Sequence, residues 1–148
     1  MPGMGNANVH RGERGVEIAA LGAWVVASLG GGHLLFNWLA KGGPPAKVTR
    51  FPALVVAGHP LLGIAGLAAW IAYLATARAA YVWLAFAVLL VVTFQGFMLF
   101  TRWLVGRGGR HARGADQRFP AAAVAVHAAV AAATFVLVLL SAIEVTRG

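Results

Sequence analysis

Four long runs of hydrophobic residues, separated by short polar or basic segments, dominate the chain. The runs cover approximately residues 16–40, 51–77, 80–105 and 119–143. Each exceeds the roughly 20 apolar residues that a helix needs to cross the hydrocarbon core of a bilayer. Each is also too long and too continuous for a barrel strand, in which lipid-facing and inward-facing residues alternate. The pattern predicts an all-α integral membrane protein, a four-helix bundle with four spans.

The same pattern predicts the domain organisation. Residues 1–15 are polar and rich in glycine, which favours a mobile N-terminal tail. Residues 16–148 then form a single transmembrane domain. A cleavable signal peptide is not expected, because the first apolar run is too long and no small-residue cleavage site with a mature domain follows it.

Composition and charge narrow the class of protein further. Of the 148 residues, 60% are hydrophobic and only 11% are charged, against about 25% charged in a soluble domain. The net charge of +8 does not indicate nucleic acid, because the basic residues lie between the apolar runs. The absence of cysteine excludes disulfides, thiolate metal sites and a thiol nucleophile. The four spans exclude a soluble enzyme, and no phosphate-binding loop, nucleophile–base pair or paired carboxylate is found in the sequence.

The basic residues also predict the orientation. Two loops, after the first and third runs, carry eight of them against the single acid Asp116: Lys41, Lys47, Arg50, Arg102, Arg107, Arg110, Arg113 and Arg118. Short loops rich in lysine and arginine remain in the cytoplasm. We therefore expect a multi-pass protein of the inner (plasma) membrane, embedded in the lipid bilayer with both termini outside.

The sequence contains an internal repeat. The stretch RFPALVVAGH at residues 50–59 and the stretch RFPAAAVAVH at residues 118–127 are identical at seven of ten positions. Upstream, LFNWLAKGG at residues 35–43 resembles LFTRWLVGRGG at residues 99–109 when two inserted residues are allowed. The repeat predicts two duplicated helical hairpins, about 16–77 and 80–143. Hairpins inserted in the same direction form a parallel repeat, related by a pseudo-twofold axis along the membrane normal.

The repeat places two histidines at one depth. Pro52 and Pro120 suit the first turn of a helix, where no backbone donor is needed. His59 and His127 each follow seven residues later, about 10 Å along the helix. His33 precedes the first lysine of its loop by eight residues, about 12 Å from the same membrane face. Three histidines on three helices are therefore expected to share one layer.

An ionisable side chain inside a membrane marks a candidate functional site, because lipid offers it no partner. The alternative is that each histidine hydrogen-bonds a neighbouring helix and so stabilises the bundle. A pseudo-twofold axis would bring His59 and His127 face to face, the axial arrangement of a b-type haem. A porphyrin needs small neighbouring side chains, and Gly63, Gly66 and Gly32 are the candidates. The alternative for these glycines is close packing of helices.

Two arginines are candidates for the haem propionates. Arg50 and Arg118 begin the two copies of the repeated phrase, at the cytoplasmic ends of their helices. Each guanidinium could bind one carboxylate through two hydrogen bonds. The alternative is topology alone, since arginine is expected at cytoplasmic helix ends.

The third run departs from the repeat. The position that matches His33 is Phe97 or Met98, depending on where the gap is placed, and the layer has no fourth histidine. A second bis-histidine haem is therefore not expected. Gln95 and Thr93 are the uncharged polar residues in the middle of this run, and they would hydrogen-bond across the bundle or face a substrate such as a quinone.

This arrangement resembles that of the membrane-embedded b-type cytochromes, whose four-helix bundles hold haem between histidines on separate helices. The resemblance covers the four spans and rests on His33, His59 and His127. It implies a haem b electron-transfer protein or the membrane subunit of an oxidoreductase, with His59 and His127 as the ligand pair. One haem near one face cannot carry electrons across the bilayer, so a quinone or a redox partner subunit is also implied.

Two other functions remain open from the sequence. His33, His59 and His127 could together bind zinc or copper and leave a fourth coordination position open. The protein could also be a non-catalytic membrane subunit or a transport protein, and a homo-oligomer is open under either function. Its histidines would then stabilise the bundle or relay protons.

Overall fold

The described part of the chain consists of four α-helices. In this computed structural model, residues 4–41, 52–106 and 119–147 are described. All four helices are long and apolar enough to cross a membrane, which confirms the predicted all-α bundle. The helices are α1 (Met4–Ala40), α2 (Ala53–Thr76), α3 (Ala79–Gly106) and α4 (Ala121–Arg147).

The two copies of the repeated phrase begin their helices in the same way. The carbonyl of Pro52 accepts a hydrogen bond from the N–H of Val56 at 3.1 Å, and the carbonyl of Pro120 accepts one from the N–H of Val124 at the same distance. Proline is tolerated there because its missing N–H would have no partner in the first turn. The helix starts expected from the sequence are thus found in the structure.

Helix α1 extends further upstream than the sequence predicts. It begins at Met4, inside the segment that the polar composition assigns to a tail. No proline lies between Met4 and Ala40, and each residue added to an existing helix gains one backbone hydrogen bond. The helix therefore continues through residues 4–15 without needing the apolar packing on which the sequence prediction relied.

A two-residue connection joins α2 to α3. Its first residue, Ala77, has a left-handed backbone conformation, with φ 52° and ψ 23°, and its N–H donates to the carbonyl of Tyr73 at 2.7 Å. Such a left-handed residue often ends a helix, and its N–H bonds a carbonyl of the last turn that would otherwise have no partner. The chain consequently reverses at once, and α2 and α3 form a tight antiparallel hairpin.

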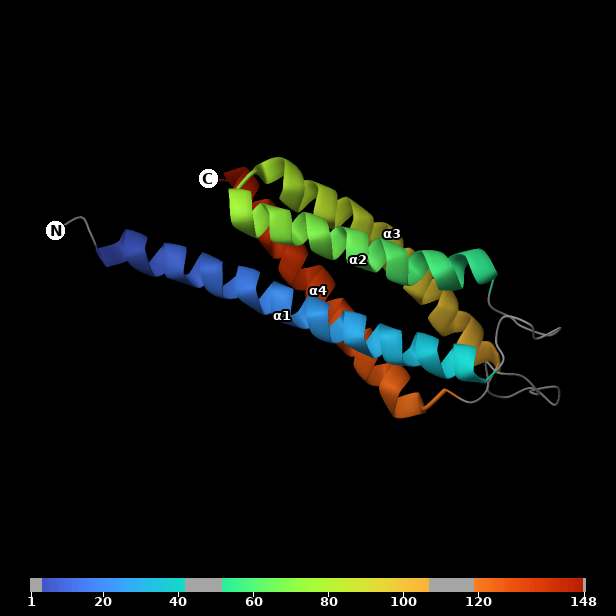
Figure 1. The fold of residues 1–148 in the computed structure, drawn as a ribbon. Coiled ribbons are helices and arrows are strands. Elements are labelled where there is room, and N and C mark those ends of the chain that lie inside the picture. Colours follow the sequence, from blue (N-terminus) through green and yellow to red (C-terminus); the bar gives the residue numbers. More distant parts are fainter. Residues whose placement is uncertain (1–3, 42–51, 107–118, 148) are drawn as a thin grey trace.

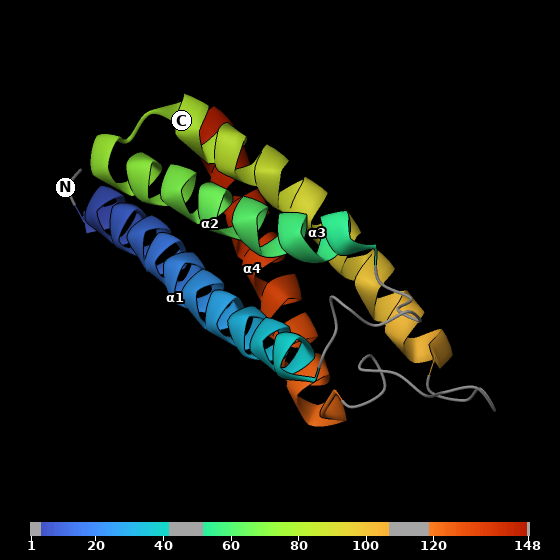
Figure 2. The ribbon, with the colours of Figure 1, turned by 45° about the vertical axis from the view of Figure 1, so that its right-hand side comes forward.

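The helices pack as two close pairs. Helix α2 packs most extensively on α3, and α1 on α4, whereas the contacts of α3 with α4 and of α1 with α2 are smaller. Both termini lie at one end of the bundle, and the ends of α1 and α3 lie at the other (Figure 1; a second view is Figure 2). Exchanging the two halves of the repeat maps the α2/α3 pair onto the α4/α1 pair, so the packing follows the duplication.

The buried residues fix the register between the halves. In α1 and α3 they repeat with an offset of 65 residues, and in α2 and α4 with an offset of 68. The clearest pair is Trp38 and Trp103, which are both buried in one small cluster. Other buried pairs are Ala20 with Ala85, Trp24 with Leu89, Trp70 with Val138, and Tyr73 with Ser141. This register assigns Met98 as the position equivalent to His33.

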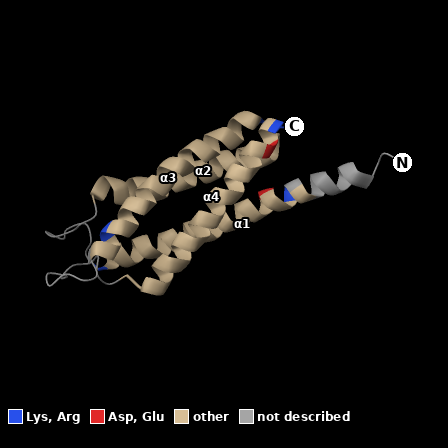
Figure 3. Ribbon diagram, turned by 180° about the vertical axis from the view of Figure 1, so that it is seen from behind, with Lys and Arg blue, Asp and Glu red and all other residues tan. Residues whose placement is uncertain are grey.

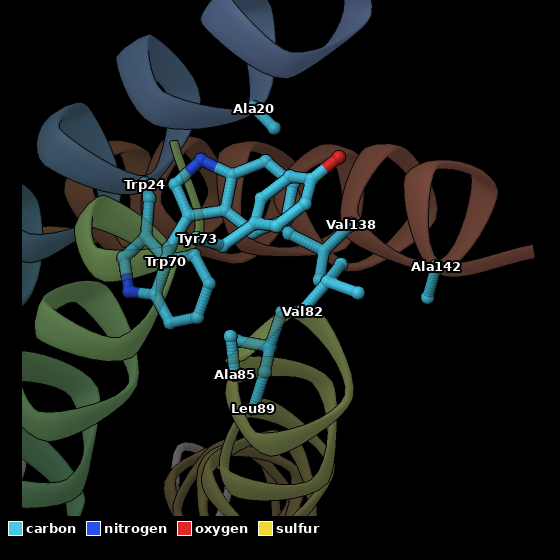
Figure 4. Packing of buried hydrophobic residues seen from close by; sticks show 9 residues of the cluster. All are labelled: Ala20, Trp24, Trp70, Tyr73, Val82, Ala85, Leu89, Val138 and Ala142. Carbon is cyan, nitrogen blue, oxygen red and sulfur yellow. The ribbon is translucent and has the colours of Figure 1, made fainter. Parts of the chain in front are cut away.

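The main core lies in the half of the bundle that contains the termini. Figure 4 shows indole and phenol rings from α1 and α2 packed against aliphatic side chains from α3 and α4. The Trp24 indole lies on Gly66, where an ideal Cβ would come within 2.7 Å of Cζ2, and its Nε1 donates to the Gly63 carbonyl at 3.1 Å. Glycine at position 66 is therefore required for α1 to approach α2.

The side chains on the outer surface of the bundle are largely apolar, whereas those on the surface of a soluble protein are largely polar. Large apolar side chains are exposed, among them Leu54 (85%), Leu29 (70%) and Phe94 (68%). Lysine, arginine and acidic residues lie toward the two ends of the bundle, and the middle lacks them within the described residues (Figure 3). Since lipid solvates apolar side chains as well as a protein core does, this distribution indicates a multi-pass protein in a lipid bilayer.

Candidate functional site

His59 and His127 meet in the middle of the bundle. They come from α2 and α4, which lie diagonally across it, because each of these helices packs on α1 and α3. The centroids of the two imidazole rings are 6.2 Å apart, and the ring planes are inclined by 73°. The repeat thus brings its two histidines together, as the pseudo-twofold axis predicts.

The backbone of α1 forms the surroundings of His127. The ring lies on Gly30 and Gly31, and an ideal Cβ at Gly31 would be 3.1 Å from its Cε1 atom. Its Nδ1 donates a hydrogen bond to the carbonyl of Ala27 at 3.0 Å. Because a ring N–H must occupy Nδ1 to make this bond, Nε2 is the nitrogen left to bind a ligand.

His59 has an equivalent position on α3. Its ring lies on Gly96, where an ideal Cβ would again be 3.1 Å from Cε1. The backbone carbonyl of Val92 is directed at this ring as a hydrogen-bond acceptor. Both contacts follow the register, since Gly96 and Val92 lie 65 residues after Gly31 and Ala27. One difference remains, because Nδ1 of His59 is buried and makes no hydrogen bond.

The distance between the rings is suited to a shared metal. A ring nitrogen binds a metal at about 2.0–2.1 Å and lies about 1.1 Å from the ring centre, so two imidazoles on opposite sides of one metal would have centroids about 6.2–6.4 Å apart. The observed separation is 6.2 Å. The glycines also leave both rings free of side-chain crowding on their helix-facing side. The two rings are therefore close enough for one shared metal ion to lie between them.

His33 does not join this pair. Its side chain is exposed on α1, and its Nε2 lies 3.0 Å from the amide nitrogen of Asn37, which also donates to the His33 carbonyl at 2.9 Å. Among the described residues no group of three or more histidine, cysteine, aspartate or glutamate side chains could hold a metal. The three-histidine layer expected from depth alone is not assembled.

The glycines predicted to line the site have other surroundings. Gly63 and Gly66 receive the Trp24 indole, and an ideal Cβ at Gly32 would meet nothing within 4 Å. The glycines that do contact the histidines are Gly30, Gly31 and Gly96. The sequence carried a signal for Gly96, since it follows Gly31 by the same 65 residues that separate Trp38 from Trp103. The ambiguous gap in the repeat hid that offset.

Of the four remaining candidate residues, the structure describes two. Arg50 and Arg118 lie outside the described residues. The hydroxyl of Thr93 donates to the Leu89 carbonyl of its own helix at 2.8 Å, so it does not bridge helices. Gln95 does reach α2, since its Nε2 lies 3.5 Å from an ideal Cβ at Gly58, and its Oε1 is buried without a hydrogen bond.

No protein-family model, no curated protein and no solved structure matches the chain. The site is therefore interpreted from its own chemistry. It contains two imidazoles on equivalent glycines, and one of these imidazoles is oriented by a backbone carbonyl. Within the described ranges no carboxylate lies with the two histidines in a group that could hold a metal.

Proposed function

We propose that this chain is an integral membrane electron-transfer protein that binds one haem b between His59 and His127. The observation that carries the proposal is the facing pair itself. Two histidines at equivalent positions of a repeat lie 6.2 Å apart, centroid to centroid, from diagonally opposite helices. Each is seated on a glycine of a different neighbouring helix, so the two close helix pairs contribute one ligand each.

The small number of ligands favours haem over zinc or copper. Zinc sites use three or four protein ligands, whereas the described residues supply two in this place. A porphyrin brings four nitrogens of its own and needs only the two axial ligands from the protein. The three-histidine zinc or copper site, which requires His33, has less support from the geometry.

The surrounding residues would orient the ligands. The Ala27 carbonyl accepts the Nδ1 proton of His127, which fixes the tautomer, sets the ring orientation and raises the basicity of Nε2. A haem held by His59 and His127 would supply a one-electron couple. Electrons would have to arrive and leave through a quinone or a redox partner subunit.

A structural role is the second candidate, and the same hydrogen bond favours it. The bond from His127 to the Ala27 carbonyl joins α4 to α1, as an interhelical polar contact in a membrane would do. On this hypothesis the protein is a non-catalytic subunit or a transport protein, and its histidines serve packing alone.

Visible spectroscopy separates the two functions. The full chain is purified in detergent from haem-replete cells, and spectra are recorded oxidised and after reduction with dithionite. We expect a Soret band, sharp reduced bands and one haem per chain by pyridine haemochrome. His59→Ala and His127→Ala should each abolish the spectrum. His33→Ala is the matched control and should retain it, because the His33 side chain is exposed on α1.

A colourless protein would overturn the haem proposal. Metal analysis of the same preparation then tests zinc and copper. If no metal is present and His59→Ala lowers the free energy of unfolding by only about 0.6 kcal/mol, the average for interhelical polar contacts in membranes, the structural role is supported.

A further inference from the structure

The two histidines differ in what surrounds Nδ1. In His127 this nitrogen donates to the Ala27 carbonyl, whereas in His59 it is buried without a hydrogen bond. The Val92 carbonyl, at the place equivalent to Ala27, is also directed at the His59 ring as an acceptor, but outside the distance and angle of a normal hydrogen bond. The backbone therefore holds the ring proton of His59 less firmly than that of His127.

The register identifies the residue next to this nitrogen. In the half of the site that contains His127, an ideal Cβ at Gly30 lies 3.5 Å from Nδ1 of the His127 ring. The residue 65 positions after Gly30 is Gln95. The register thus puts the Cβ atom of Gln95 at the place on α3 that is equivalent to this ideal Cβ on α1, on the side of His59. Its amide nitrogen lies 3.5 Å from an ideal Cβ at Gly58, the residue that precedes His59.

Two buried polar atoms lack a hydrogen bond in this part of the bundle, one on α2 and one on α3. They are Nδ1 of His59 and Oε1 of Gln95, and both are buried. One is a donor when it carries the ring proton, and the other is only an acceptor. An unpaired buried polar atom costs about 1–3 kcal/mol, and in a bilayer no bulk water relieves it. The ring N–H of His59 and the amide oxygen of Gln95 could therefore satisfy each other with one hydrogen bond.

We propose that Gln95 is a positioning residue that accepts a hydrogen bond from Nδ1–H of His59, directly after rotation of the amide or through one bridging water. The bond holds the ring proton on Nδ1 and leaves Nε2 for a ligand. His127 obtains the same tautomer from a backbone carbonyl, which a substitution cannot remove. His59 obtains it from a side chain, so this half of the site can be tuned by substitution at position 95.

The tautomer is tested without any cofactor. The apo chain is labelled with ¹⁵N-histidine in detergent micelles, and the ring nitrogen shifts are recorded at a pH of about 9, where imidazole is neutral. The His59 signals are assigned by their loss in His59→Asn. We expect the Nδ1–H form to predominate in the wild type and the Nε2–H form to predominate in Gln95→Leu. Thr93→Val is the control, since Thr93 bonds only its own helix, and it should leave the ratio unchanged.

The same hydrogen bond should also affect the midpoint potential of a bound haem, a consequence that rests on the proposed function and is measured separately. A stronger acceptor on Nδ1 makes Nε2 more basic, which stabilises the ferric state. The midpoint potential should therefore fall in Gln95→Glu and rise in Gln95→Leu, with the bis-histidine spectrum retained in both. Equal potentials in the two variants would overturn this part.

The failures of the two proposals can be told apart. A colourless wild-type protein rejects the haem while the tautomer experiment still stands. A His59 tautomer ratio that is the same in the wild type and in Gln95→Leu overturns the positioning role, whether or not haem is bound. A correctly folded Gln95→Leu protein is verified by unchanged signals of the remaining histidines.

Discussion

Gly31 and Gly96 occupy the same place against the two central histidines. An ideal Cβ at either residue would lie 3.1 Å from the Cε1 atom of the facing imidazole. That distance is shorter than nearly all real Cβ contacts. Each ring can therefore occupy its place only because the facing residue has no side chain. The equivalence is the most direct sign that the duplicated hairpins build one symmetric site.

A large side chain at either glycine should displace a histidine. We expect Gly31→Leu and Gly96→Leu each to lower the free energy of unfolding by about 1–3 kcal/mol, as overpacking does in cores, and to abolish any haem spectrum. Gly32→Leu is the control on the same helix, because an ideal Cβ there meets nothing within 4 Å. Thermal unfolding in detergent, followed by circular dichroism, gives the comparison. Equal effects at Gly31 and Gly32 would contradict the observed packing of α1 on α4.

A hydrogen bond ties α1 to α2 at the end of the bundle that contains the termini. The Tyr73 hydroxyl donates to Oε1 of Glu17, and Tyr73 is buried. The equivalent residues of the other half, Ser141 and Val82, make no such bond, since Ser141 donates to the carbonyl of Leu137 in its own helix. The contact is therefore specific to the first half.

Removing this hydroxyl should destabilise the bundle. Hydrogen bonds to charged groups contribute about 1.5–3 kcal/mol, so we expect Tyr73→Phe to lower the free energy of unfolding by about that amount. Thr76→Val, which removes an exposed hydroxyl bonded to its own helix, should change it by no more than about 0.5 kcal/mol. Titration with a denaturing detergent measures both. A loss for Tyr73→Phe no greater than that for Thr76→Val would argue against the bond.

The connection between α2 and α3 predicts a stabilising substitution. Ala77 has a φ of 52°, a conformation that costs an L-residue with a Cβ about 1–2 kcal/mol and that glycine adopts freely. Ala77→Gly should therefore raise the free energy of unfolding by about 1 kcal/mol. Ala87→Gly, at an exposed position inside α3, should lower it by about the same amount. A loss of stability at both positions would show that the connection is not left-handed.

The absence of cysteine allows the predicted orientation to be tested directly. Arg78→Cys and Lys41→Cys each introduce a single thiol, at opposite ends of the bundle. If the basic loops are cytoplasmic, a membrane-impermeant maleimide should label intact cells that carry Arg78→Cys. It should label Lys41→Cys only after the membrane is permeabilised. The reverse pattern would place both termini in the cytoplasm.

The sequence by itself determined the features that depend on local chemistry. Span number follows from the length of each apolar run, because a helix must be long enough to cross the hydrocarbon core. The starts of α2 and α4 follow from Pro52 and Pro120, because proline fits the first helical turn. The pairing of His59 with His127 follows from duplication, since two copies of one hairpin place equivalent residues symmetrically.

Tertiary structure decided which side of each helix faces the centre. The sequence comparison of His33 with the other histidines used depth alone, but a helix turns by about 100° per residue. Because Gly31 faces His127, the side chain of His33 points about 200° away and is exposed. The same packing assigned Gly66 to Trp24, Gly96 to His59 and Gln95 to Gly58. Helix rotation is set by the sum of all interhelical contacts, so no single stretch of the sequence could specify it.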